Sequence, residues 1–151
     1  MRYLNLHCLC SKVQWANLRR VLSASENLHL KNRGVSIFDI IKYRIGYAEA
    51  GQYSGKIIIP SYDADGQLNY FVSRAFYKHD TQKHKNPQVS KDIIGFEMLI
   101  NWNEPIILCE GAFDAIAIKR NAIPLYGKTL SRALTKKLLS NNIKSIYDTD
   151  Y

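Results

Sequence analysis

Residues 105–150 of the chain read PIILCEGAFDAIAIKRNAIPLYGKTLSRALTKKLLSNNIKSIYDTD. Short apolar runs at 106–109, 123–126 and 143–147 alternate with helix-like stretches at 112–121 and 129–142. Strands separated by roughly 10 to 15 helical residues are typical of βαβ units, in which right-handed crossovers connect parallel strands. We therefore predict an α/β fold with three parallel strands in this part of the chain.

The acidic residues of this segment follow the predicted strands. Glu110 comes directly after the first strand, Asp148 and Asp150 follow the third, and Asp114 lies one helical turn beyond Glu110. Parallel strands end at one edge of a sheet, where open α/β sheets bind ligands. If the first and third strands are neighbours, these carboxylates converge, and a hard cation such as Mg²⁺ or Mn²⁺ would offset their repulsion. Taken singly, however, a Glu-Gly pair is also typical of a solvated turn, and Asp-x-Asp also occurs in helix caps.

The preceding part of the chain has a different pattern. Residues 56–60 are rich in β-branched side chains, residues 62–67 contain the Asp65-Gly66 turn signal, and residues 68–76 alternate polar and apolar, which predicts an antiparallel hairpin. Short helices are expected over residues 11–24 and over 37–43, the second beginning with Ser36 and Asp39 at capping-box spacing. We place the boundary near residues 101–105, between an α+β lobe (1–103) and the α/β segment (104–151).

Composition and charge limit the possible functions. Lys and Arg number 21 against 13 Asp and Glu, which gives a formal charge of +8 and favours a polyanionic partner, nucleic acid before a membrane surface. Residues 74–91 are the most basic stretch, although a solvated charged loop would have the same composition. No apolar run approaches the roughly 20 residues that span a bilayer. The first ten residues do not resemble a signal peptide, and the odd number of cysteines fits a reducing, cytoplasmic location.

The order of these motifs resembles a known family. A Glu-Gly after one strand and an Asp-x-Asp after a later one resemble the toprim domain that topoisomerases and primases share. The stretches LKNRGVSIFDIIKYRIGYA (30–48), SGKIIIPSYDADGQLNYFVSRAF (54–76) and KHKNPQVSKDIIGFE (83–97) resemble the amino-terminal lobe of the RNA-polymerase domain of bacterial-type DNA primases, the phage versions most closely. The resemblance covers roughly residues 28 to 150.

The resemblance implies a function and a set of site residues. It makes Glu110, Asp148 and Asp150 the catalytic, metal-binding carboxylates, with Asp114 in support. The positions that it implies for nucleic-acid and nucleotide binding are Lys56, Arg74, Lys83, Asn86 and Lys91. The implied reaction is the synthesis of short RNA primers from ribonucleoside triphosphates on a single-stranded DNA template during replication. It also implies Mg²⁺ or Mn²⁺ as cofactor, a replicative helicase as a further partner, and the cytoplasm, of the host if the protein is phage-encoded.

The sequence departs from the family pattern at both ends. Primases of this type usually carry an amino-terminal zinc ribbon with paired Cys-x-x-Cys ligands, whereas Cys8 and Cys10 are separated by one residue and have no second pair. We therefore expect no complete zinc site; His7, Cys8 and Cys10 are either the remnant of a ribbon or ordinary packing residues. At the other end the sequence stops just after Asp150, so the toprim segment is expected to be incomplete. Two alternatives stay open: a non-catalytic remnant that binds single-stranded nucleic acid, and another toprim enzyme such as a nuclease.

Overall fold

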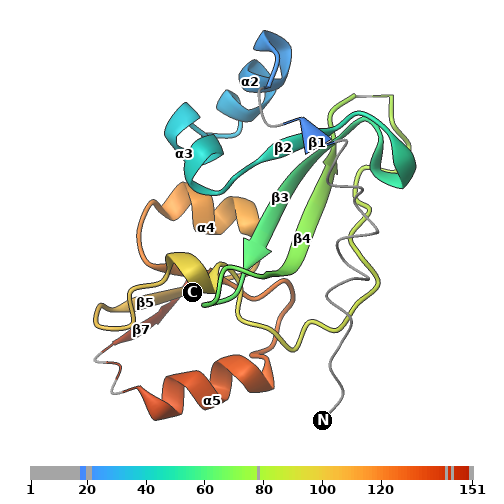
Figure 1. Ribbon diagram of the computed structural model, residues 1–151. Helices are drawn as coiled ribbons and strands as arrows, with labels where there is room; N and C mark the ends of the chain where they lie inside the picture. Colours follow the sequence, from blue (N-terminus) through green and yellow to red (C-terminus); the bar gives the residue numbers. More distant parts are fainter. Residues whose placement is uncertain (1–17, 20–21, 78, 142, 144, 150–151) are drawn as a thin grey trace. The chain divides into compact units, whose positions relative to one another are not determined.

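Two β-sheets organise the chain (Figure 1). The computed structural model describes residues 18–19, 22–77, 79–141, 143 and 145–149. The chain divides into two compact units: the first comprises Met1–Pro60 and Tyr70–Gln88, and the second comprises Ser61–Asn69 and Val89–Tyr151. The predicted boundary near residue 103 therefore falls inside the second unit.

The first sheet contains β1 (Leu18–Arg19), β2 (Gly46–Ala48), β3 (Lys56–Tyr62) and β4 (Leu68–Ala75), in that order. The β-branched run Ile57 to Ile59 of β3 is completely buried, which explains why these residues form a strand. Asp63 closes the turn that follows, because its Oδ1 accepts hydrogen bonds from the backbone N–H groups of Asp65 and Gln67 at 3.0 and 2.8 Å. The predicted hairpin is thus confirmed.

Two short helices, α2 (Ala24–Lys31) and α3 (Ile37–Lys42), belong to the first unit. Each begins with a capping box, Ser23 with Glu26 and Ser36 with Asp39, which confirms the second predicted helix. The helix expected over 11–24 is wrong in its described part, because the backbone of Leu18–Arg19 pairs with β2 and the helix begins only at Ala24. The rest of that range lies mostly outside the described residues.

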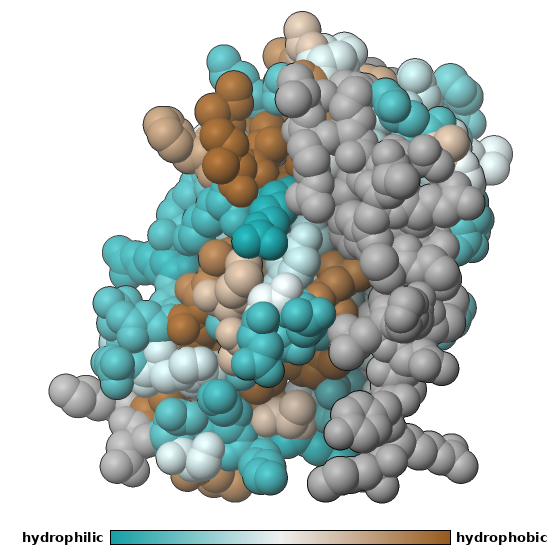
Figure 2. All heavy atoms as spheres, viewed as in Figure 1, coloured by the Kyte–Doolittle hydropathy of each residue, from teal (hydrophilic) through white to brown (hydrophobic). Residues whose placement is uncertain are grey.

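Helix α3 buries little of its apolar surface. Figure 2 shows hydrophobic side chains gathered at the surface over α2 and α3, where Leu28, Ile37, Phe38 and Ile41 are exposed. Single turns of 3₁₀ helix lie at Gly51–Tyr53 in the first unit and at Glu97–Leu99 in the second. Among the described residues, no helix is long and apolar enough to cross a membrane.

The second unit contains the predicted βαβαβ segment: β5 (Ile106–Cys109), α4 (Ala112–Ile118), β6 (Ala122–Pro124), α5 (Arg132–Ser140) and β7 (Ile146–Asp148). Its strands are parallel in the order β6-β5-β7, which confirms the α/β prediction. Helices α4 and α5 lie on opposite faces of this sheet (Figure 1). The core on the α5 side is formed by Ile94, Ile106, Leu108, Ile123 and Leu134.

Residues 89–100 pack against the parallel sheet. Ile94 belongs to its core, and the backbone N–H of Phe96 donates to Ser61 Oγ at 2.9 Å. A Cβ atom added at Gly95 would lie only 2.4 Å from the carbonyl oxygen of Pro124, so the two backbones are in close approach. This packing explains why the division between the units falls before residue 89 rather than near 103.

Candidate active site

Glu110 stands at the end of the central strand of the parallel sheet. Strand β5 is largely buried, with Ile106, Leu108 and Cys109 at 0, 6 and 1% exposure, whereas Glu110 is exposed. Within the part of the chain that the structure describes, its carboxylate has no hydrogen bond or ion pair. The apolar strand therefore ends at an exposed carboxylate that is available to a ligand.

Asp148 lies at the same edge. Strand β7 pairs directly with β5, and Asp148, its last residue, is in register with Leu108. Thr149 continues along β5, with its N–H and Oγ both donating to the Leu108 carbonyl, at 3.2 and 3.3 Å. The condition for convergence, that the first and third strands be neighbours, is met, and Glu110 and Asp148 occupy the carboxyl-terminal edge of adjacent strands. Asp150 lies outside the described residues.

Asp114 has a local partner. Its Oδ2 accepts a hydrogen bond from the Gly111 N–H at 3.0 Å, so it caps the start of α4 and fixes the turn that carries Glu110. A Cβ at Gly111 would meet the same oxygen at 3.0 Å, which favours glycine there. Glu110 and Asp148 offer the carboxylate oxygens that Mg²⁺ and Mn²⁺ prefer. Among the described residues, no three acidic, His or Cys side chains lie close enough to form a metal site.

Lys91 brings a positive charge to this edge. Its Nζ donates to the carbonyl oxygen of Tyr126 at 2.7 Å, and Tyr126 follows β6 in a left-handed conformation with φ of 55°. The N–H of Leu125 donates to the Cys109 carbonyl at 2.8 Å, so the chain after β6 runs beside the end of β5. The ammonium of Lys91 is therefore held at the edge that also carries Glu110.

In the first unit, Arg74 and Asn86 form one hydrogen-bonded group. Arg74 Nη1 donates to the Ser73 carbonyl at 2.9 Å and to Asn86 Oδ1 at 3.2 Å, while the same Oδ1 accepts from the Ser73 N–H at 3.1 Å. Ser73 Oγ also donates to the Lys85 carbonyl at 2.6 Å, and Arg74 forms a β-bridge with His84. The basic stretch after β4 is thus tied to the strand rather than being a free loop.

Several cations influence one another in this unit. Burial and then the charge of Arg33 lower the pKa of Arg74, against a smaller opposite effect of Tyr70. Burial, followed by the charges of Arg74, Arg33 and Lys83, lowers the pKa of His84. Such mutual effects require proximity, so we define these four residues as the basic cluster: Arg33, Arg74, Lys83 and His84. Sequence reasoning missed Arg33, which is distant in the chain, and counted His84 without assigning it a role.

Comparisons with known proteins bear on this arrangement. No family model matches the chain. An uncharacterized protein of Mycoplasma genitalium, MG010, is 31% identical over 129 residues, which cover 79% of this chain and 58% of that protein. A DnaG primase catalytic domain solved with single-stranded DNA superposes with a TM-score of 0.75 at 17% identity, over 94% of this chain and 60% of that one. A DNA primase domain from Pseudomonas aeruginosa gives a TM-score of 0.72 at 18% identity, over 95% of this chain and 60% of that one.

This chain has the primase fold. At 17 and 18% identity the likeness to the solved structures concerns the fold alone. The chain spans about three fifths of the length of each of these three proteins, 58% of the first and 60% of the other two.

Lys56, which the sequence predicts to bind nucleic acid, is buried and paired within the chain. It is 4% exposed, and its Nζ contacts Asp80 Oδ2 at 2.6 Å and the Gln82 carbonyl at 2.8 Å. The hydrogen bond from Lys56, and then that from the Gln82 N–H, lowers the pKa of Asp80. The ammonium of Lys56 thus holds the loop after β4, whereas Lys83 is exposed.

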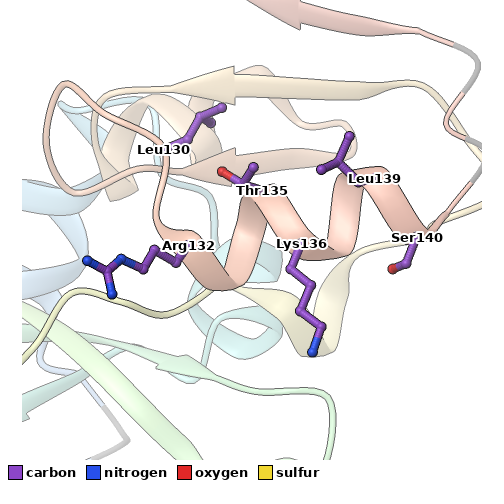
Figure 3. Close-up of a pocket in the computed structure, with 6 residues that line it drawn as sticks. All are labelled: Leu130, Arg132, Thr135, Lys136, Leu139 and Ser140. Atoms are coloured by element: carbon purple, nitrogen blue, oxygen red, sulfur yellow. The ribbon is translucent and has the colours of Figure 1, made fainter.

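A separate hollow of about 550 Å³ runs along α5 in the second unit. In Figure 3, Leu130, Thr135 and Leu139 project to one side of the helix, and Arg132 and Lys136 project to the other. The lining contains no carboxylate and none of the predicted site residues. The candidate active site is therefore the edge formed by β5 and β7 and not this hollow.

Proposed function

We propose that this chain carries the catalytic strands and the template-binding surface of a primase-type nucleotidyltransferase, which synthesises short RNA primers on single-stranded DNA. The observation that carries the proposal is the parallel pairing of β5 with β7, which puts Glu110 and Asp148 at one edge of the sheet. The primase fold supports the same assignment.

The proposed roles follow from what each side chain contacts. Glu110 and Asp148, together with Asp150, would hold Mg²⁺ or Mn²⁺, with Asp114 keeping the turn of Glu110 in place. A divalent cation bound there would supply positive charge that favours ionisation of a 3′-hydroxyl and offsets charge on the phosphates. Within the described part of the chain, Lys91 uses one of its three N–H donors on Tyr126, so the others are available for a phosphate oxygen.

The basic cluster would bind the template backbone. Four basic side chains with shared electrostatic influence suit a row of phosphates, and binding of this kind weakens steeply with salt because counterions are released. In the reaction, the 3′-oxygen of one ribonucleotide forms a bond to the α-phosphorus of the next triphosphate, while the bond to pyrophosphate breaks. The protein needs no nucleophile of its own. A helicase partner, which the resemblance implies, belongs to the same proposal.

The test is primer synthesis. The protein is incubated with a single-stranded template, labelled ribonucleoside triphosphates and Mg²⁺ or Mn²⁺, and the products are separated by size. We expect short RNA that disappears in Glu110→Gln and persists in Glu104→Gln, a matched exposed acid that precedes β5 at the opposite end of the strand. Cleavage of the template instead would favour a toprim nuclease. Salt-sensitive binding with neither product would favour a non-catalytic binding module.

A further inference from the structure

The first unit contains an open polar hollow of about 610 Å³ that none of the roles above uses. It lies between the segment that joins β2 to β3 and the loop that follows β4. The residues relevant to its chemistry are Glu49, Ser54, Tyr77, His79, Asp80 and Thr81.

One side of the hollow is aromatic. Tyr77 is 47% exposed, and its ring stacks on His79, with the ring centroids 5.4 Å apart and the planes at 26°. The Phe76 ring packs edge-on against the Tyr77 ring, with the two ring centroids 4.8 Å apart. A Cβ on Gly55 would lie 3.6 Å from the Tyr77 ring, so the backbone there is also close to it. The ring is thus held in place while much of its surface remains accessible. A fixed, accessible aromatic ring is the platform on which proteins stack unpaired nucleobases.

The remainder of the hollow offers hydrogen-bond acceptors. Asp80 accepts from Lys56 through one carboxylate oxygen and from the Gln82 N–H through the other, which uses two of about four acceptor positions. Glu49 contributes a second carboxylate. Carboxylates accept from N–H groups, and the N1–H and N2–H₂ of guanine form an adjacent pair of donors. Thymine and uracil have a single N–H donor flanked by carbonyl oxygens, which carboxylates repel.

The hollow shares a loop with the basic cluster. His79, Asp80 and Thr81 line the hollow, and Lys83 and His84 belong to the cluster a few residues later. From this placement we infer that the hollow binds one unstacked nucleobase of a single strand, guanine in preference to thymine. The inference rests on the proposed template-binding role, because the cluster would hold the phosphates of the strand whose base enters the hollow.

Fluorescence anisotropy with two labelled strands tests the inference. One strand is about 12 thymidines long and the other carries a guanine at its centre. We expect the guanine strand to bind about tenfold more tightly, and Tyr77→Ala and His79→Ala to remove most of that difference. Tyr77→Phe should retain it. Phe38→Ala, which removes an exposed aromatic ring elsewhere in the same unit, should change nothing. Melting curves verify that each variant is folded.

The outcomes separate this inference from the proposed function. Lys83→Ala should weaken both strands equally and reduce the salt dependence, because it removes a phosphate contact. Suppose that Lys83→Ala weakens both strands equally, but the wild-type protein already binds the two strands with the same affinity, as Tyr77→Ala and His79→Ala do. The base site is then refuted and the template surface stands. If Lys83→Ala has no effect, the template surface itself fails. Titration with free guanosine monophosphate distinguishes the source of the base: an affinity equal to that of the guanine strand would overturn a strand site, and weaker binding supports it.

Discussion

Glu110 and Asp114 follow the same strand but have different surroundings. Asp114 is used locally, since its carboxylate accepts the Gly111 N–H at the start of α4. Glu110 has no such partner among the described residues and is exposed where β5 ends. An acid in the first turn of a helix can accept from the free backbone N–H groups there, whereas an acid at the carboxyl end of a strand faces the edge where open α/β sheets bind ligands. Within the proposed function, Glu110 is therefore the catalytic carboxylate and Asp114 a positioning residue.

His84 gives the basic cluster a dependence on pH. Burial and the neighbouring charges of Arg74, Arg33 and Lys83 hold its pKa below the ordinary value of 6.5. Phosphates bound at the cluster would offset these charges, so the pKa should rise on binding and a proton should be taken up. Affinity for single-stranded DNA should consequently increase a few-fold between about pH 7.5 and 5.5. Anisotropy titrations at constant ionic strength measure this. His84→Gln should lose the increase, and an unchanged pH dependence in that variant would contradict the assignment.

Some residues could be placed from the sequence and others could not. Glu110 and Asp148 were predictable because their positions follow from strand ends, which local patterns indicate. The pairing of Lys56 was not predictable, because its partners Asp80 and Gln82 lie 24 and 26 residues away in the chain. A sequence reports that a lysine is basic, but whether its charge is paired depends on tertiary packing.

Among the helices and strands, those with a regular pattern of apolar residues were predicted correctly. The apolar strands of the parallel sheet alternate with helices, and all five elements were found in order. Helix α2 was missed because it buries only Glu26 and Leu30 and leaves Leu28 57% exposed, so no apolar stripe marks it. Its signal was the capping box formed by Ser23 and Glu26.

The contact between residues 89–100 and β6 requires glycine at position 95. Any side chain there would collide with the Pro124 carbonyl, and backbone cannot move aside as easily as a flexible side chain. We expect Gly95→Ala to lower the free energy of unfolding by about 3 kcal/mol, the upper end for overpacking. Gly127→Ala is the matched control, because nothing lies within 4 Å of a Cβ there, and it should change stability by less than about 0.5 kcal/mol. Urea denaturation measures both; equal effects of the two substitutions would refute the close approach.

At the scale of the whole molecule, the two units have different proposed tasks. The acidic edge formed by β5 and β7 lies entirely in the second unit, whereas the basic cluster and the polar hollow lie entirely in the first. Metal binding can therefore be tested through acidic residues of one unit, and template binding through basic and aromatic residues of the other. Cation binding and template binding can each be measured on this chain separately from primer synthesis.

A calorimetric titration with Mn²⁺ tests most directly whether the acidic edge binds a metal ion. We expect the wild-type chain and Glu104→Gln to bind Mn²⁺ with equal affinity, and Glu110→Gln and Asp148→Asn to bind it about tenfold more weakly or worse, because each loses a charged ligand. Asp114→Asn should have a smaller effect, since the amide oxygen can still accept the Gly111 N–H. Absence of Mn²⁺ binding, or binding that neither Glu110→Gln nor Asp148→Asn weakens, would contradict a metal-dependent site at the ends of β5 and β7.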